Sequence, residues 1–150
     1  MSGFVTPECV IVGESVSSRE DVLHCISQRA CELGIASDAD CVYEAFLERE
    51  AQGPTGMSNG FAIPHAVSHA VIKSGVIICK SPCALVWPSF DGDPITVAVA
   101  LLVPADEASS THMRLLSQTA TLLLSESFRD LVRASDDPAQ IADAVSAGFE

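Results

Sequence analysis

Short apolar runs alternate with amphipathic stretches along the first third of the chain, which predicts strands and helices in turn. The β-branched run at 9–12, CVIV, predicts a strand. Apolar residues recur at helical spacing between 17 and 33, and Ser17 with Glu20 three residues later predicts a capping box at the start of this helix. Gly34 follows the last apolar position, where a glycine in the left-handed conformation commonly ends a helix.

A second helix and a glycine-rich loop are predicted next. The helix is expected to begin at Asp38 or Asp40 and to run to the loop that follows. Residues 53–60, GPTGMSNG, contain three glycines and a proline, so a helix cannot cross them. The segment 61–64, FAIP, predicts a short strand stopped by its proline, and a turn or short helix is expected at 65–73.

The second half of the chain predicts further strands and then helices. Two strands are expected at 75–79 and 84–87, joined at Ser81-Pro82. The uninterrupted apolar run at 95–103 is typical of a central strand that is covered on both faces. Helices on both sides of these strands predict an α/β sandwich, in a single domain that spans residues 1–150. The three further helices are expected at 110–124, 126–134 and 138–147, the last with Asp137 as its N-cap and Pro138 as its first residue.

Composition narrows the class of protein. The chain has 150 residues, 48% of them hydrophobic, with 20 Asp and Glu against 8 Lys and Arg, for a net charge of −12. So few cations argue against a nucleic-acid binder, and the apolar content argues against a disordered acidic tail. No uncharged apolar run approaches the roughly 18 residues needed to cross a bilayer, and the first residues lack the regions of a secretory signal. A cytoplasmic protein is therefore expected.

The acidic residues are unevenly distributed. Residues 1–50 and 91–150 each carry ten acids and three arginines, whereas 51–90 contain no Asp or Glu and carry Lys73 and Lys80. The three segments therefore contribute −7, −7 and +2, which together give the net charge of −12. Two interpretations remain open. The acid-free segment holds buried strands, in which charges are costly, or it surrounds a site for a negative group.

The six cysteines are expected to be structural. Because no export signal is visible, free thiols are a better assumption than disulfides. The closest pair, Cys79 and Cys83, is separated by three residues, whereas zinc-binding pairs usually have two between them. Most of the others lie in apolar helical patterns, where a free cysteine acts as a small apolar residue.

The histidines are the candidates for chemistry. The sequence contains no Gly-x-Ser-x-Gly elbow, no phosphate-binding P-loop and no dinucleotide fingerprint. His65 directly follows Pro64, so the strand predicted before it would place the imidazole at a strand end, facing outward past the glycine-rich loop. Ligands of open α/β sheets usually bind at such strand ends. A structural role for His65 is the alternative.

The other histidines and one arginine each leave alternatives open. His69 would lie beside His65 on a helix, which predicts either a metal-binding pair or an exposed neighbour. His112 lies in the first turn of the helix predicted after the central strand, where the free backbone N–H groups attract anions. In that position it would lie at the same sheet edge as His65. Arg49 either balances the end of its helix or grips an anion. His24 is expected to be structural.

These parts fit phosphoryl-transfer chemistry. An imidazole can attack phosphorus and form a covalent phosphohistidine. The transfer then depends mainly on positioning and on positive or dipolar groups that stabilise the phosphoryl oxygens. His65, His112 and Arg49 would supply these functions, although composition alone does not select them.

At these residues the sequence resembles the enzyme IIA (EIIA) component of the bacterial phosphoenolpyruvate-dependent sugar phosphotransferase system, in its fructose/mannitol class. The most specific part is Ala62-Ile63-Pro64-His65, combined with the downstream His112-x2-Leu115-Leu116. The resemblance covers nearly the whole chain in order. Its further motifs are Glu48-Arg49-Glu50, Thr55-Gly56, Asn59-Gly60, Trp87, Asp91-Gly92-Asp93-Pro94-Ile95 and Leu101-Leu102-Val103-Pro104.

The resemblance implies a mixed sheet flanked by helices and a defined chemistry. His65 would accept a phosphoryl group from the phosphohistidine of the carrier protein HPr and pass it to a cysteine of enzyme IIB (EIIB). The sugar, with a fructose-like sugar favoured, would be phosphorylated during import by the membrane enzyme IIC (EIIC). His112 and Arg49 would support the phosphoryl group, and no metal or organic cofactor is implied. HPr and EIIB would be separate proteins, because no second module fits in the chain.

Two alternatives remain beside sugar transport. The nitrogen-related branch of the same family keeps the phosphorylatable histidine but controls partner proteins by its phosphorylation state. The second alternative is a metal-binding module that uses His65 and His69.

Overall fold

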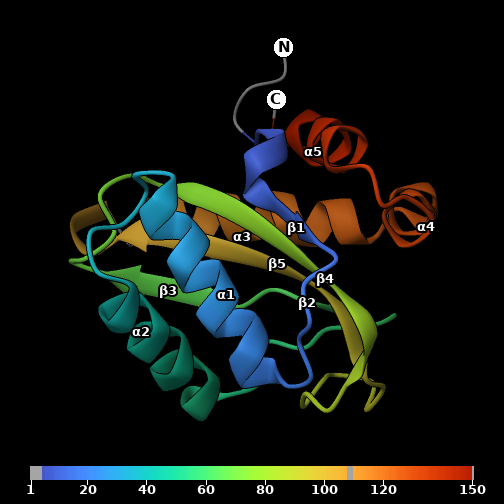
Figure 1. Cartoon of the computed structure of the whole chain (residues 1–150), viewed down its shortest axis with the longest axis horizontal. Coiled ribbons are helices and arrows are strands. Elements are labelled where there is room, and N and C mark those ends of the chain that lie inside the picture. The colour runs from blue at the N-terminus through green and yellow to red at the C-terminus, as the bar shows by residue number, and fades with distance from the viewer. Residues whose placement is uncertain (1–4, 108–109, 150) are drawn as a thin grey trace.

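The computed structural model describes residues 5–107 and 110–149, which fold into a sheet with helices on both faces (Figure 1). The strands are β1 Val10–Val12, β2 Phe61–Ala62, β3 His65–Ser68, β4 Gly75–Leu85 and β5 Ile95–Pro104. The helices are α1 Arg19–Glu32, α2 Ala39–Gln52, α3 Ser110–Leu123, α4 Glu126–Ala134 and α5 Pro138–Ala147. Two short 3-10 helices, η1 Pro7–Cys9 and η2 Ala105–Glu107, precede β1 and follow β5.

The sheet is mixed, as the resemblance implies. Its strand order is β1-β4-β5-β2, and β3 also pairs with β5, next to β2. β4 runs antiparallel to β5, while β1 is parallel to β4 and both β2 and β3 are parallel to β5. In Figure 1, α1 and α2 lie in front of the sheet and α3 passes behind it, while α5 packs against η1 and β1. The expected α/β sandwich is confirmed.

β5 is the centre of this arrangement. It pairs with β4 on one side and with β2 and β3 on the other, and all but one of its ten residues are buried. Leu101 and Leu102 have no exposed surface. The continuous apolar run predicted such a strand, because a charge or polar side chain on either face would lie against a packed helix.

The helix ends follow the predicted pattern with one correction. Ser18 caps α1 instead of Ser17: its hydroxyl accepts from the backbone N–H of Asp21 at 3.0 Å. The carboxylate of Asp21 in turn accepts from the N–H of Ser17 at 2.9 Å. Asp21 therefore takes the place expected for Glu20, although its carboxylate bonds the N–H of Ser17 and not that of the N-cap Ser18, as a capping box would. Gly34, with φ of +74°, ends the helix as predicted.

The caps of two other helices agree with the prediction. Asp38 caps α2 by accepting from the N–H of Cys41 at 3.2 Å, and Asp137 caps α5 by accepting from the N–H of Ala139 at 3.0 Å. Pro138 occupies the first position of α5, where its missing N–H leaves no hydrogen bond unmade.

Two predictions for the strands were wrong. Residues 65–68 form a strand, β3, and not a turn or helix, because β5 offers them a parallel partner that is distant in sequence. The proline does not stop the pairing, since the carbonyl of Pro64 accepts from the N–H of Leu101 at 2.9 Å.

β4 is one strand and not two. Pro82 lies between Lys80 and Leu85, where the register with β5 shifts. The missing N–H of the proline therefore costs no hydrogen bond between the two strands.

The longest helices, α1, α2 and α3, have 14 residues each. A helix needs about 20 apolar residues to cross the hydrocarbon core of a bilayer. Within residues 5–107 and 110–149, no helix combines the length and the apolar character that a membrane span requires.

Candidate functional site

His65 is the first residue of β3 and lies opposite Leu101 of β5. The prediction that its imidazole faces outward at a strand end was wrong: only 5% of the residue is exposed. Neither ring nitrogen has a hydrogen-bond partner among the residues that the structure describes. Burial, followed by the nearby His112 and the charge of Arg49, lowers the pKa of His65 from 6.5 to about 3. The imidazole is therefore neutral at physiological pH, with a lone pair on one nitrogen.

His112 lies beside this ring, although the two histidines are far apart in the sequence. It belongs to the first turn of α3, and the two ring centroids are 5.0 Å apart with an edge-to-face inclination of 61°. Burial first, and then the charge of Arg49, lowers the pKa of His112. The sequence prediction that the helix after the central strand brings His112 to His65 agrees with this geometry.

Arg49 lies in the last turn of α2 and is half-buried. Its Nη1 donates to the carbonyl oxygen of Gly53 at 2.7 Å, so the guanidinium is tied to the start of the glycine-rich loop. The charge of Arg49 contributes to the lowered pKa of both His65 and His112. All three predicted site residues therefore interact electrostatically.

Glu50 is a further residue of this region, to which the sequence motifs assigned no role. Its side chain is 2% exposed, and its carboxylate accepts hydrogen bonds from the N–H of Thr55 at 3.3 Å and from the Thr55 hydroxyl. A signal was present in the sequence. Glu50 follows Val42 and Phe46 at intervals of four, and these three residues form the buried face of α2.

The two other histidines lie outside this cluster. His69 is exposed and follows the end of β3, so the helix that would have placed it beside His65 does not form. Across the described part of the chain, no group of three or more His, Cys, Asp or Glu could hold a metal ion. His24 packs edge-on against Tyr43 with ring centroids 5.4 Å apart, which joins α1 to α2.

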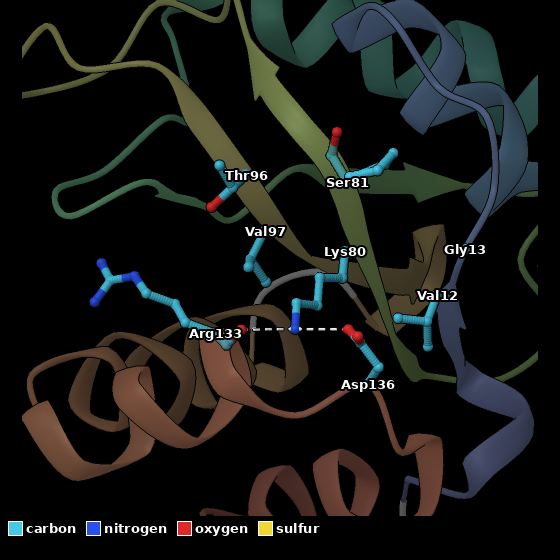
Figure 2. Close-up of a pocket in the computed structure, with 9 residues that line it drawn as sticks. Val12, Gly13, Lys80, Ser81, Thr96, Val97, Arg133 and Asp136 are labelled. Carbon is cyan, nitrogen blue, oxygen red and sulfur yellow. Dashed lines mark hydrogen bonds and ion pairs between the residues drawn. The ribbon is translucent and has the colours of Figure 1, made fainter.

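A cavity of about 640 Å³ lies elsewhere, between the sheet and α4 (Figure 2). It is bordered by Lys80, whose ammonium donates to the carbonyls of Arg133 and Ser135 and pairs with Asp136 at 3.0 Å. The guanidinium of Arg133 donates to the carbonyl of Asn59 and lies 5.3 Å from the ring centre of Phe61. Because the cations of this cavity already have protein partners, they tie α4 to the sheet and to the loop before β2.

The six cysteines are all free thiols. Cys9 and Cys79 are buried, and Cys41 and Cys83 are exposed. Burial is the main cause that raises the pKa of Cys79 to about 12, so this thiol stays protonated. The expectation of free thiols agrees with this arrangement.

The family model of the phosphoenolpyruvate-dependent sugar phosphotransferase system, EIIA 2, matches residues 3–147. The chain belongs to this family. The resemblance found in the sequence motifs is thereby confirmed, and the family's role makes the chain a phosphotransferase component in general terms.

Curated relatives of this EIIA 2 chain include transport components and regulatory proteins. A 2-O-alpha-mannosyl-D-glycerate-specific EIIABC component of Escherichia coli is 31% identical over 130 residues, which are 86% of this chain and 20% of that protein. This chain thus spans a fifth of that relative's length. A nitrogen regulatory protein of Klebsiella oxytoca is 29% identical, covering 97% of this chain and 90% of the relative. A fructose-specific EIIA component of Haloferax volcanii is 27% identical, covering 95% and 92%.

Solved structures share the fold of this EIIA 2 chain. The nitrogen regulatory protein IIA-Ntr of Neisseria meningitidis superposes with a TM-score of 0.85 at 21% identity, covering 95% of this chain and 96% of that one. The mannitol enzyme IIA of Escherichia coli superposes with a TM-score of 0.76 at 18% identity, covering 92% and 96%. These likenesses confirm the predicted α/β architecture.

Proposed function

We propose that this chain is a phosphoryl-carrying EIIA domain, spanning residues 1–150, that accepts a phosphoryl group on His65 from phosphorylated HPr. It then passes the group to a cysteine of an EIIB protein, which works with the membrane component EIIC in sugar uptake. The observation that carries the proposal is a buried, neutral imidazole beside a second imidazole, in the field of an arginine. Its partners place the chain in the cytoplasm.

The chemistry of acceptance follows from the neutral state of His65. Its lone pair attacks the phosphorus of the donor phosphohistidine, so that a nitrogen–phosphorus bond forms on His65 as the one on the donor breaks. The donor imidazole leaves with that bond's electron pair. Arg49 and His112 stand beside the acceptor to stabilise the phosphoryl oxygens, which is the main requirement of such transfers.

The distribution of charge supports the same role. A phosphoryl group brings between one and two negative charges, and neighbouring carboxylates would oppose it. The segment 51–90, which carries His65, contains no Asp or Glu. The acidic segments 1–50 and 91–150, which flank it in the sequence, are expected to attract a basic surface on the donor. Transfer rates that do not change with salt concentration would contradict this electrostatic steering.

Two comparisons support EIIB as the acceptor and a fructose-like sugar as the cargo. A structural neighbour with a TM-score of 0.78 was solved as the complex of the mannitol enzyme IIA with phosphorylated enzyme IIB of Escherichia coli. The Haloferax volcanii relative, which this chain covers almost in full, is fructose-specific.

A regulatory function is the second candidate, and the nitrogen regulatory relatives favour it. This chain covers 90% of the Klebsiella oxytoca protein and superposes on the Neisseria meningitidis IIA-Ntr structure. Both functions use phosphorylation at His65 and differ in the fate of the phosphoryl group. Genes for EIIB and EIIC beside this one, and transfer from the phosphorylated chain to that EIIB, would favour transport. The absence of both would favour regulation.

The decisive test is labelling by phosphorylated HPr. Wild-type protein is expected to gain one phosphoryl group, and His65→Ala is expected to gain none. His69→Ala is the matched control, because His69 is exposed and lies outside the histidine pair, and it should be labelled like wild type. Unchanged labelling of His65→Ala would contradict the proposal. Stoichiometric zinc or nickel in the purified protein would instead favour a metal-binding module.

His112 is assigned to the support of the phosphoryl group. His112→Ala is therefore expected to accept the group but to pass it on abnormally. The rate of transfer from the purified phosphorylated variant to EIIB measures this. If that rate equals the wild-type rate, His112 is a structural residue only.

A further inference from the structure

Glu50 is the one buried acidic residue among those that the structure describes. An ionised carboxylate away from water is costly unless hydrogen bonds and an opposite charge compensate for it. Here the N–H and the hydroxyl of Thr55, itself 3% exposed, both donate to the carboxylate. Arg19 of α1 supplies the opposite charge, with its Nη1 at 3.9 Å. The surroundings of Glu50 therefore compensate for the burial of its carboxylate.

Two consecutive hydrogen bonds connect the carboxylate of Glu50 to Ile63, on the segment that leads into His65. The carboxylate holds Thr55, and the carbonyl of Thr55 accepts from the N–H of Ile63 at 3.0 Å. Ile63 stands two residues before His65, and Pro64 between them is paired with β5 through its carbonyl. The loop that follows α2 is thus fastened against the strand that presents the histidine.

Arg49 and Glu50 fasten this loop at two points. Arg49 donates to the carbonyl of Gly53, and Glu50 accepts from Thr55, two residues further along. The two residues together hold the loop from Gly53 to Thr55 against the end of α2.

We propose that Glu50 is a positioning residue for phosphoryl transfer at His65, acting through Thr55 and Ile63. The inference rests on the proposed function, in which His65 is the acceptor. Attack on phosphorus requires alignment of the lone pair with the bond that breaks, so a small displacement of the imidazole slows the transfer without weakening donor binding.

The test compares variants of Thr55, since Glu50 variants can fail to fold. Thr55→Val removes the hydroxyl that donates to Glu50, and Thr55→Ser keeps it. Thr119→Val is the matched control, because Thr119 is fully buried in α3 and its hydroxyl has no partner within the described residues. Single-turnover phosphorylation is measured over a range of phosphorylated HPr concentrations.

Thr55→Val is expected to lower the maximal rate about tenfold and to leave the half-saturating donor concentration unchanged. Thr55→Ser and Thr119→Val should stay within about twofold of wild type. Wild-type kinetics in Thr55→Val would overturn the inference, as would an equal loss in Thr119→Val. A loss in Thr55→Val that Thr55→Ser does not restore would overturn it as well.

A second measurement separates this inference from the proposed function. The amide resonances of Ile63 and His65 should shift in Thr55→Val and remain in place in Thr119→Val, whether or not the protein accepts a phosphoryl group. If wild-type protein is not phosphorylated, the proposed function fails while these spectra still report whether Glu50 positions His65. Unshifted resonances in Thr55→Val would overturn the positioning role.

Discussion

The burial of His65 predicts a specific loss of stability in mild acid. The folded protein keeps the imidazole neutral because burial, His112 and Arg49 lower its pKa to about 3. In the unfolded chain the same group titrates near its ordinary pKa of 6.5. Between these pH values the unfolded state binds one more proton than the folded state, so acid favours unfolding. The stability is complete above pH 6.5 and is lost as the pH falls toward 3.

The size of the effect follows from the linkage between proton binding and folding. Each pH unit inside the window lowers the free energy of unfolding by about 1.4 kcal/mol. From pH 7.5 to pH 5, the pH crosses the unfolded-state pKa of 6.5 and then falls about one and a half units below it. His65 alone should therefore lower the free energy of unfolding by about 2 kcal/mol over this range. This range stays above the isoelectric point near 4.5, where precipitation is expected.

The assay is urea denaturation of wild type and His65→Gln at several pH values across this range. Because all other titrating groups are shared, the difference between the two free energies of unfolding isolates His65. This difference should fall by about 2 kcal/mol from pH 7.5 to pH 5. Parallel curves, with a difference constant to about 0.5 kcal/mol, would refute a buried neutral imidazole, and so would an imidazole resonance that titrates near pH 6.5.

Three further changes test other parts of the structure by the same denaturation assay. Gly56→Ala should lose about 2 kcal/mol, because a Cβ there would overlap the carbonyl oxygen of Pro88; full stability would mean that the loop approaches less closely. Ser18→Ala should lose about 1 kcal/mol as the N-cap of α1, whereas Ser17→Ala should lose less. Lys80→Met should lose about 2 kcal/mol, since its ammonium binds the carbonyls at the end of α4; an unchanged midpoint would show these bonds to be dispensable.

The fold was predictable wherever local chemistry decides the outcome. The run at 95–103 became the central strand β5, because a strand covered on both faces requires apolar residues at successive positions. α4 and α5 begin and end where the sequence predicted, since Ser125 and Asp137 provide caps and each helix has a buried face. In α4 and α5 the helix propensity, the capping residue and the spacing of apolar residues all indicate the same helix.

The errors occurred where a distant partner decides the outcome. Residues 65–68 carry no strong strand pattern, and they become β3 because the backbone of β5 is available beside them. A parallel partner leaves no trace in the local sequence. For α1, two adjacent serines compete for the cap, and the sequence alone does not show which of them reaches the free N–H groups.

Motifs and positions predicted His65, His112 and Arg49 as the candidate site, and the structure brings both imidazoles together. The burial of His65 could not be predicted, because the elements around it come from separate parts of the chain. Glu50 was missed because a charge in a last helical turn suggests a solvent-facing residue, although its spacing from Phe46 indicated otherwise.

The charges around the glycine-rich loop support the role that the proposed function gives to Arg49. Arg19 is committed to Glu20, at 2.9 Å, and to the buried carboxylate of Glu50, at 3.9 Å. Arg49 instead donates to a neutral carbonyl, and it forms no ion pair with any residue between 5 and 149 that the structure describes. Its charge therefore acts on the imidazoles, where it favours the neutral nucleophile before transfer. In the proposed function, the same charge would balance the negative charge of a phosphoryl group on His65, so one residue would serve both states of this histidine.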